Sequence, residues 1–300
     1  MSDMVALAQP EHIKLTPKEF RSEIKPDWCP GCGDFAVLAG LQQAMAKMGE
    51  RPENFAVVSG IGCSSNIPGY LSTYGFHGIH GRSVAVASGV KLGNPSLHVV
   101  AAGGDGDGYG IGVGHFIHAM RRNLDITYIV MDNQTYGLTT GQASPTSMKG
   151  HKTKSSPDGT YENPINPIAL ALAAGATYVS RGFSADMKGL AELIEGGIRH
   201  KGFALVDVFS PCVTFNKINT YDWFRSRVYN LQKEGHDPAD IQKAFARSLE
   251  WGDRIPLGLF YQTRLPTYDE LEPAYAIGPP PRHPLGLKNA DKENVLAEFK

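Results

Sequence analysis

Short apolar runs alternate with helical patterns along the middle of the chain. Apolar runs bounded by turn residues predict buried strands at 55–60, 97–104, 126–133, 177–182 and 203–210. Apolar residues at helical spacing predict helices at 34–48, 81–94, 110–123, 166–175 and 186–200. The polar segment 139–160 has no such periodicity and predicts a long loop. Because strands that alternate with helices pair in parallel, the pattern predicts an α/β fold built on a parallel sheet.

The two ends of the chain lack this alternation. Residues 1–25 are polar and contain proline, so we expect an N-terminal arm before a main domain at 26–225. In 226–300 we expect one amphipathic helix at 237–252, capped by Asp237, followed by an extended tail. The tail is rich in proline and aromatic residues, and whether it wraps a partner or stays disordered is open.

Charge and hydropathy exclude several broad classes of protein. Charged residues make up 20% of the chain and the formal net charge is −1, so the bulk charge gives no sign of a nucleic-acid partner. No apolar run approaches the roughly 18 residues that a membrane helix needs, and no signal-peptide pattern opens the sequence. We therefore expect a cytoplasmic protein that binds neither nucleic acid nor membrane.

A glycine-rich segment joins the strand at 97–104 to the helix at 110–123. Its sequence, AAGGDGDGYGIG, lies where α/β folds bind phosphate, because backbone N–H groups and the helix dipole face the anion there. The segment lacks the Gly-Lys-Ser/Thr of a P-loop and fits no register of the G-x-G-x-x-G dinucleotide fingerprint. We expect Gly104 and Gly106 to let the backbone approach a diphosphate.

Two polar residues follow neighbouring strands of the predicted sheet. Asp105 comes directly after one strand, and Asn133 lies 28 residues later, at the end of the next. Adjacent parallel strands would place the two side chains side by side. Their oxygens, with the backbone carbonyl of Thr135, suit Mg²⁺, which prefers hard oxygen ligands and keeps phosphate oxygens as ligands. The sequence thus predicts a magnesium–diphosphate site, with a glycine-rich turn whose aspartate caps the next helix as the open alternative.

The chain contains four cysteines, which lie in three segments: Cys29 and Cys32 in WCPGCG, Cys63 in GIGCSS, and Cys212 in SPC. The last two segments follow predicted strands, so the three segments could converge at one edge of the sheet. Four thiolates make a complete ligand set for a [4Fe–4S] cluster or for structural zinc, and the cysteine content does not choose between them. A thioredoxin-like redox pair is less favoured, because its CxxC normally follows a buried strand and it would leave two cysteines unexplained.

Several of these motifs together resemble one enzyme family. GDG followed 28 residues later by Asn resembles the metal–diphosphate motif of thiamine diphosphate enzymes. The stretch 104–146 and the motifs WCPGCGDF, SGIGCSSNIPGY, HGIHGRSVAVASGVKLGNP and ALVDVFSPCVTFN resemble the β subunit of 2-oxoacid:ferredoxin oxidoreductases, of the 2-oxoglutarate type. The likeness covers roughly residues 25–225 and is weaker beyond them.

The resemblance implies a thiamine diphosphate-binding fold and a set of site residues. It implies thiamine diphosphate held through Mg²⁺ on Asp105, Asn133 and the Thr135 carbonyl, and a [4Fe–4S] cluster on the four cysteines. By the same resemblance we expect His80, Arg82 and Ser64 near the cofactor. We expect Ser65, Asn66 and Leu138 to face the substrate.

The resemblance also implies an activity and partners. It implies oxidative decarboxylation of a 2-oxoacid with coenzyme A to acyl-CoA and CO₂, with electrons passing through the cluster to ferredoxin, in a reversible reaction. The favoured substrate is 2-oxoglutarate, followed by pyruvate or a broad range of 2-oxoacids. The glutamate that activates thiamine in such enzymes is expected on a partner α subunit, in an α2β2 assembly. The rival hypotheses are a non-redox thiamine carboligase or decarboxylase with structural zinc, and a degenerate subunit that only scaffolds a partner.

Overall fold

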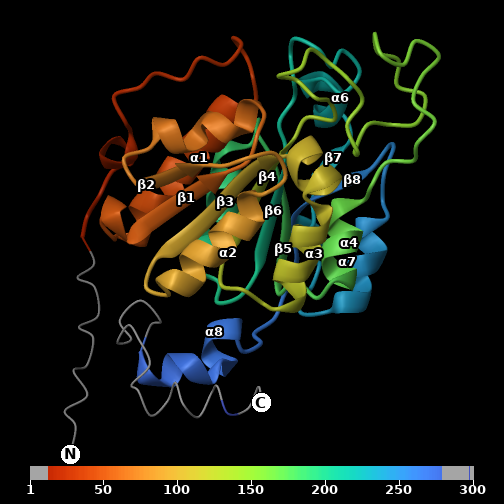
Figure 1. Ribbon diagram of the computed structural model, residues 1–300. Helices are drawn as coiled ribbons and strands as arrows, with labels where there is room; N and C mark the ends of the chain where they lie inside the picture. Colours follow the sequence, from red (N-terminus) through yellow and green to blue (C-terminus); the bar gives the residue numbers. More distant parts are fainter. Residues whose placement is uncertain (1–12, 279–296, 298–300) are drawn as a thin grey trace, which may run out of the picture.

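The computed structural model of the chain describes residues 13–278 and residue 297, and its described strands form a single mixed sheet (Figure 1). The strands are β1 (Phe55–Ser59), β2 (Tyr74–His77), β3 (His98–Gly104), β4 (Thr127–Asp132), β5 (Tyr178–Phe183), β6 (Ala204–Phe209), β7 (Val228–Asn230) and β8 (Ile255–Gln262). Their order across the sheet is β2-β1-β3-β4-β6-β5-β8-β7. The first six pair in parallel, β8 runs antiparallel to β5, and β7 runs parallel to β8. The predicted α/β fold with a parallel sheet is confirmed.

Helices cover both faces of this sheet. The described helices are α1 (Asp34–Met48), α2 (Ser83–Gly93), α3 (Val113–Arg121), α4 (Pro167–Ala173), α5 (Met187–Arg199), α6 (Tyr221–Arg225), α7 (Ile241–Ser248) and α8 (Tyr268–Leu271). Buried residues of α1 and α5 share one core cluster, and those of α2, α3, α4 and α7 share another on the opposite face. Successive strand residues alternate between the two clusters: Val57 joins the first, whereas Ala56 and Val58 join the second.

The order of the strands places a crevice near the middle of the sheet. From β1 the chain passes to β2 on one side, and from β3 it passes to β4 on the other side, so the connections leave β1 and β3 in opposite directions. In open α/β sheets such a switch point, at the carboxyl ends of the strands, is the usual place for a ligand. The turns that follow β1, β3 and β4 meet at this edge.

The segment that follows the expected main domain differs from the sequence expectation. The helix predicted at 237–252 begins at Ile241, because Asp240 accepts hydrogen bonds from Gln242 N and Lys243 N, both at 3.0 Å, and is the residue that caps it. The expected cap Asp237 instead accepts a bond from Ala239 N in the preceding turn. The prediction that Asp237 caps this helix was therefore wrong.

Three strands were not predicted from the sequence. β8 lies inside the segment expected to be an extended tail, yet it pairs with β5 within the main sheet. Its proline and glycine, IPLGLFYQ, break the alternation that marks a strand. β2 is exposed along its whole length and carries no core pattern, and β7 is only three residues long.

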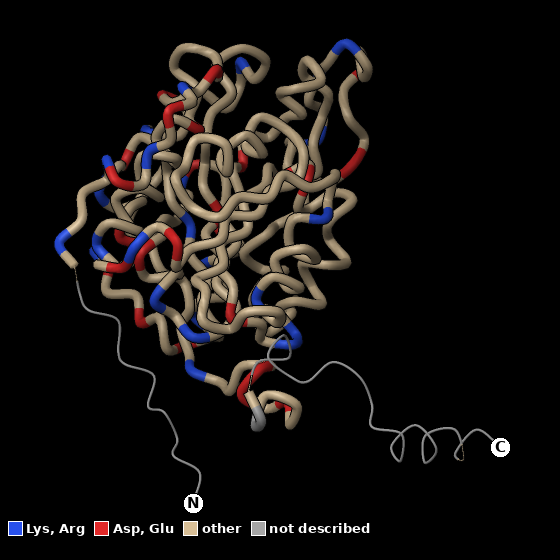
Figure 2. The backbone as a smooth tube through the Cα atoms, turned by 60° about the vertical axis from the view of Figure 1, so that its left-hand side comes forward, with Lys and Arg blue, Asp and Glu red and all other residues tan. Residues whose placement is uncertain are grey.

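The ends of the chain are described only in part. Residues 1–12 of the expected N-terminal arm, and 279–296 and 298–300 of the expected tail, lie outside the described residues. The described part of the arm packs on the domain: Phe20 is fully buried and its ring meets Phe55 edge to face. Within the described residues, no helix combines the length and apolar character that crossing a membrane requires. Figure 2 shows basic and acidic residues interspersed along the chain.

Candidate functional site

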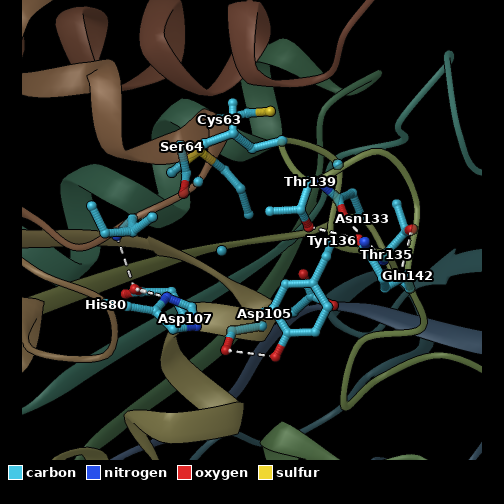
Figure 3. A pocket seen from close by; sticks show the side chains of 17 residues that line it. Cys63, Ser64, His80, Asp105, Asp107, Asn133, Thr135, Tyr136, Thr139 and Gln142 are labelled. Carbon is cyan, nitrogen blue, oxygen red and sulfur yellow. Dashed lines mark hydrogen bonds and ion pairs between the residues drawn. The ribbon is translucent and has the colours of Figure 1, made fainter. Parts of the chain in front are cut away.

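A cavity of about 530 Å³ opens at the carboxyl ends of β1, β3 and β4 (Figure 3). Its walls come from the turn after β1, the turn before α2, the glycine-rich turn after β3 and the segment after β4. The lining residues are Ile61, Gly62, Cys63, Ser64, His80, Gly104, Asp105, Gly106, Asp107, Met131, Asn133, Thr135, Tyr136, Gly137, Leu138, Thr139 and Gln142. The cavity therefore brings together most of the site residues expected from the sequence.

Asp105 and Asn133 both line this cavity, from neighbouring strands. β3 and β4 pair with Gly104 opposite Met131, so the residues after each strand end lie on the same edge. Asn133 Oδ1 accepts a hydrogen bond from Thr135 N at 3.1 Å, and Thr135 also lines the cavity. Asp105, Asn133 and Thr135 carry carboxylate, amide and carbonyl oxygens, and this set of donor types suits Mg²⁺.

Asp105 is held by two hydroxyl groups that the sequence did not reveal. Ser144 Oγ and Thr146 Oγ1 both donate to Asp105 Oδ2 at 2.5 Å, and Thr146 Oγ1 also lies 2.8 Å from Asp132 Oδ1. Burial raises the pKa of Asp105 to about 6, and the two hydroxyls act in the opposite direction. Burial, with repulsion from Asp105 second, raises the pKa of Asp132 well above its usual range. The only sequence signal for this arrangement was the Ser/Thr cluster within the predicted loop.

The two glycines of the expected phosphate turn differ in what surrounds them. A Cβ on Gly106 would collide with the ring of Tyr136, so any other residue there would have to displace that ring. A Cβ on Gly104 would meet nothing nearer than Ser64 Oγ at 3.5 Å, which leaves open space above the turn. Ser64 itself is buried, and its hydroxyl has no hydrogen-bond partner among the described residues. An unpartnered buried hydroxyl facing an open glycine turn fits a polar ligand at this point.

Asp107 is the residue whose role the sequence reasoning missed most clearly. Its Oδ1 accepts a hydrogen bond from His80 Nδ1 at 3.0 Å (Figure 3). It also accepts hydrogen bonds from Gly81 N at 2.7 Å and Ile61 N at 2.9 Å. These donors belong to the turn after β1 and to the turn before α2. The buried Asp107 carboxylate therefore connects the turn after β1 and the turn before α2 to the glycine-rich turn after β3. Without the fold, the second aspartate of GDGD carries no signal for this.

His80 and Arg82, which were expected together near the cofactor, take different positions. His80 lines the cavity, and its Nδ1 is engaged by Asp107 Oδ1 at 3.0 Å. Arg82 does not line the cavity; its Nη1 donates to Gly81 O at 3.4 Å. The three residues expected at the substrate also differ: Leu138 lines the cavity and is 59% exposed, whereas Ser65 and Asn66 do not line it. Ser65 is buried and donates to Gly62 O.

The thiols of Cys63 and Cys212 lie beside the same cavity. A Cβ on Gly137 would lie 3.6 Å from both Cys63 Sγ and Cys212 Sγ, so these two sulfurs flank one point of the cavity wall. Trp28 Nε1 donates to Cys63 O at 2.8 Å, and this bond holds the CxxC segment against the turn after β1. All four cysteines are free thiols.

The thiols are close enough to affect one another electrostatically. Burial, then Asp34, then Cys212 and Cys29 raise the pKa of Cys63 to about 11. Burial raises the pKa of Cys32 still further, with smaller contributions from Asp34, Cys63 and Cys212. Ionising Cys32 and Cys63 would therefore need a positive centre beside them, which an iron or zinc site supplies. Across the described residues, no three His, Cys, Asp or Glu side chains are arranged to hold a single metal ion.

Comparison with known proteins gives consistent matches over most of the chain. Residues 60–208 match the family model of the thiamine pyrophosphate enzyme C-terminal TPP-binding domain, and residues 212–276 match the C-terminal model of the pyruvate ferredoxin oxidoreductase β subunit. A 2-oxoacid:ferredoxin oxidoreductase subunit β of a Sulfolobus species is 50% identical over 257 residues, which span 81% of this chain and 84% of that protein. The 2-oxoglutarate oxidoreductase subunit KorB of Mycobacterium tuberculosis is 47% identical over 78% of this chain and 61% of that protein.

A solved structure is similar along nearly the whole chain. It is the 2-oxoglutarate:ferredoxin oxidoreductase from Magnetococcus marinus with 2-oxoglutarate, coenzyme A and succinyl-CoA bound. The TM-score is 0.88 at 43% sequence identity, and the match covers 97% of this chain and 100% of that one.

Proposed function

Because this chain belongs to the β subunits of the thiamine-dependent 2-oxoacid:ferredoxin oxidoreductases, we propose that it oxidises 2-oxoglutarate with coenzyme A to succinyl-CoA and CO₂. Electrons leave through a [4Fe–4S] cluster to ferredoxin, and the reaction is reversible. One observation carries the proposal: the oxygen ligands Asp105 and Asn133 and the thiol of Cys63 line the same cavity. A diphosphate site and a redox centre would thus lie within one pocket.

The oxygen side of the cavity fits thiamine diphosphate. When bound, thiamine diphosphate supplies a nucleophilic carbon and an electron sink for decarboxylation of a 2-oxoacid. Asp105, Asn133 and the Thr135 carbonyl hold Mg²⁺, and the open turn at Gly104 lets the backbone approach the diphosphate. The buried Ser64 hydroxyl is available to bond a polar group of the cofactor or substrate, since no group in the described part of the chain engages it.

The thiol side of the cavity fits an iron–sulfur cluster. Four cysteines from three segments supply the complete ligand set, and none remains over. The cluster provides one-electron transfer, which zinc cannot provide because it has no redox chemistry. The positions of Cys63 and Cys212 next to Gly137 would set this centre directly beside the space for the thiamine ring and its substrate.

The charge of the cavity supports a partner subunit. Its lining contains Asp105 and Asp107 but no lysine or arginine. The diphosphate and the 2-oxoacid are both anions, and Mg²⁺ alone leaves the substrate carboxylates without a cationic partner. An α subunit would supply those cations, the glutamate that activates thiamine and the contacts to coenzyme A. We propose that the two subunits work as an α2β2 assembly.

The names of the relatives favour 2-oxoglutarate as substrate. Three archaeal relatives are named 2-oxoglutarate synthase subunit KorB, and the similar solved structure holds 2-oxoglutarate. Pyruvate and other 2-oxoacids remain the alternative, since other relatives are named only for 2-oxoacids.

The decisive experiment is a count of iron, acid-labile sulfide and zinc on enzyme purified without oxygen. About four iron and four sulfide per chain are expected, as for one [4Fe–4S] cluster. The same preparation should reduce ferredoxin only when 2-oxoglutarate, coenzyme A and thiamine diphosphate are all present. Zinc near one per chain without sulfide would reject the redox mechanism and favour a thiamine carboligase or decarboxylase. Iron with activity on pyruvate alone would reject only the substrate.

A further inference from the structure

Two loops leave neighbouring strands of the sheet, and each carries a residue expected to bind a cofactor. β4 and β6 pair in parallel with Asp132 opposite Phe209, so both strands end at the same edge (Figure 1). The turn after β4 contains Asn133, a candidate Mg²⁺ ligand, and the loop after β6 contains Cys212, a candidate cluster ligand. The two segments are joined where they begin, because Ser210 N donates to Asp132 O at 2.9 Å. The two candidate sites therefore start from adjacent strand ends.

One buried residue, Asn216, connects these two loops further on. Asn216 is 1% exposed and does not line the cavity. Its side-chain Nδ2 donates to Asn133 O at 3.0 Å, and its backbone N–H donates to Cys212 O at 3.1 Å. A single residue thus bonds to the backbone of a candidate metal ligand and to the backbone of a candidate cluster ligand.

The amide of Asn216 is held in one orientation by its own loop. Its Oδ1 accepts hydrogen bonds from Ile218 N at 3.0 Å and from Asn219 N at 2.9 Å. Asparagine side chains commonly stabilise a turn in this way, by accepting from backbone N–H groups a few residues further along the chain. Because the oxygen is fixed within the turn, the NH₂ group is directed at Asn133. The bond to Asn133 therefore joins two well-defined segments.

A second contact between the same loops lies on the side of the cavity. A Cβ on Gly137 would lie 3.6 Å from the sulfurs of both Cys63 and Cys212, and 3.9 Å from Asn133 Nδ2. The side-chain amide of Asn133 and the two sulfurs therefore surround one point of the cavity wall. Protein interiors are closely packed, so a shift of one such group is passed to its neighbours.

The position of Asn216 suits a residue that acts between two cofactors and touches neither. Binding of Mg²⁺ would fix the side chain of Asn133, and the bond to Asn133 O would carry this restraint to the loop of Cys212. A change of charge at the cluster would act on the same bonds in the opposite direction. Coupling between two binding sites is reciprocal, so each site should report the state of the other.

We propose that Asn216 is a positioning residue that couples the magnesium–diphosphate site to the iron–sulfur cluster. This role rests on the proposed function, because it requires both cofactors to be bound by the residues assigned to them. Asn216 holds Asn133 and Cys212 in a fixed relation, so that the redox state of the cluster changes the affinity of the diphosphate site. Without this bond, each site keeps its own ligands but no longer responds to the other.

The test measures thiamine diphosphate binding to the complete enzyme in its oxidised and reduced states. Equilibrium dialysis at a fixed concentration of Mg²⁺ gives the dissociation constant before and after the cluster is reduced with dithionite. In the parent enzyme the two constants should differ at least about fivefold, the lower end of typical coupling between sites. The ratio of the two constants is the informative quantity, because a variant that only weakens the fold changes both alike.

Asn216→Ser removes the connection between the loops. Serine can accept from the backbone N–H groups of the turn, but it is too short to reach Asn133 O. The ratio of the two constants should fall below about twofold, with iron and sulfide retained. Asn219→Ser is the matched control, because it shortens another buried amide of the same loop, which bonds to Asn216 rather than to Asn133. It should keep the ratio of the parent enzyme.

The outcomes separate this role from the proposed function. A parent enzyme that contains the cluster but binds thiamine diphosphate equally in both states would overturn the coupling and leave the proposed function intact. A ratio in Asn216→Ser equal to that of the parent would show that the coupling does not need Asn216. Loss of iron from Asn216→Ser but not from Asn219→Ser would also overturn it, because Asn216 would then only fold the cysteine loop. Absence of iron and sulfide from the parent would refute the proposed function, and the coupling with it.

Discussion

Thr146→Val tests whether the loop hydroxyls hold the metal-binding carboxylate in place. Valine keeps the shape of threonine but cannot donate, so the variant loses the bonds from Thr146 Oγ1 to Asp105 Oδ2 and to Asp132 Oδ1. Hydrogen bonds to charged groups contribute about 1.5–3 kcal/mol each. The variant retains the Ser144 bond to Asp105, so the carboxylate is loosened rather than freed.

The expected result is weaker binding of Mg²⁺ in the presence of thiamine diphosphate. Losing a residue that orients a metal ligand typically lowers metal affinity 10- to 100-fold. We expect about a tenfold rise in the apparent dissociation constant for Thr146→Val, and about a hundredfold rise for Ser144→Ala combined with Thr146→Val. Turnover at saturating Mg²⁺ should change much less than the affinity.

The assay is calorimetric titration of Mg²⁺ into enzyme with excess thiamine diphosphate, alongside Mg²⁺-dependent turnover. Thr153→Val, in the same loop but outside the cavity, is the matched control. If the double variant bound Mg²⁺ as tightly as the parent enzyme, the hydroxyls would not orient Asp105 and the reasoning would fail. Loss of turnover at saturating Mg²⁺ with unchanged affinity would also contradict it.

Three further predictions test other parts of the structure. Asp107→Asn keeps an acceptor for the backbone amides but removes the charge beside His80. Turnover should therefore fall at least about tenfold, with little loss of thermal stability. A loss of turnover matched by an equally large loss of thermal stability would indicate a purely structural role. Gly106→Ala should abolish thiamine diphosphate binding because its Cβ meets the Tyr136 ring, whereas Gly89→Ala, with open space around it, should bind normally by calorimetry. Burial lowers the pKa of His200 to about 4, so the unfolded chain takes up the proton more readily than the folded chain. The free energy of unfolding therefore falls as the pH drops from about 6.5 towards 4, and thermal melting of His200→Asn should show a loss that is smaller than that of the parent protein by no more than about 3 kcal/mol. Identical pH dependence in the two proteins would argue against this role of His200.

The sequence by itself determined the α/β fold and the family to which the chain belongs. Buried parallel strands appear as continuous apolar runs, and a glycine turn followed by aspartate marks the end of one of them. Because Asp105 and Asn133 each follow such a strand with one helix between, their placement at one edge followed from local rules alone. The structure puts both in one cavity. The roles of these residues and of the four cysteines as ligands stay predictions.

Only the tertiary structure decided which side chains surround them. The donors to Asp107 lie 26 to 46 residues away along the chain, and Ser144 and Thr146 lie 39 and 41 residues from Asp105. No periodicity links such distant positions, because the place of a residue in a loop depends on where the two ends of that loop join the sheet. The antiparallel pairing of β8 with β5 could not be predicted either, because the proline and glycine of β8 break the sequence pattern of a strand. The strand is recognised only from its pairing with β5. Local sequence thus determines where strands end, while contacts between segments distant in sequence decide what meets there.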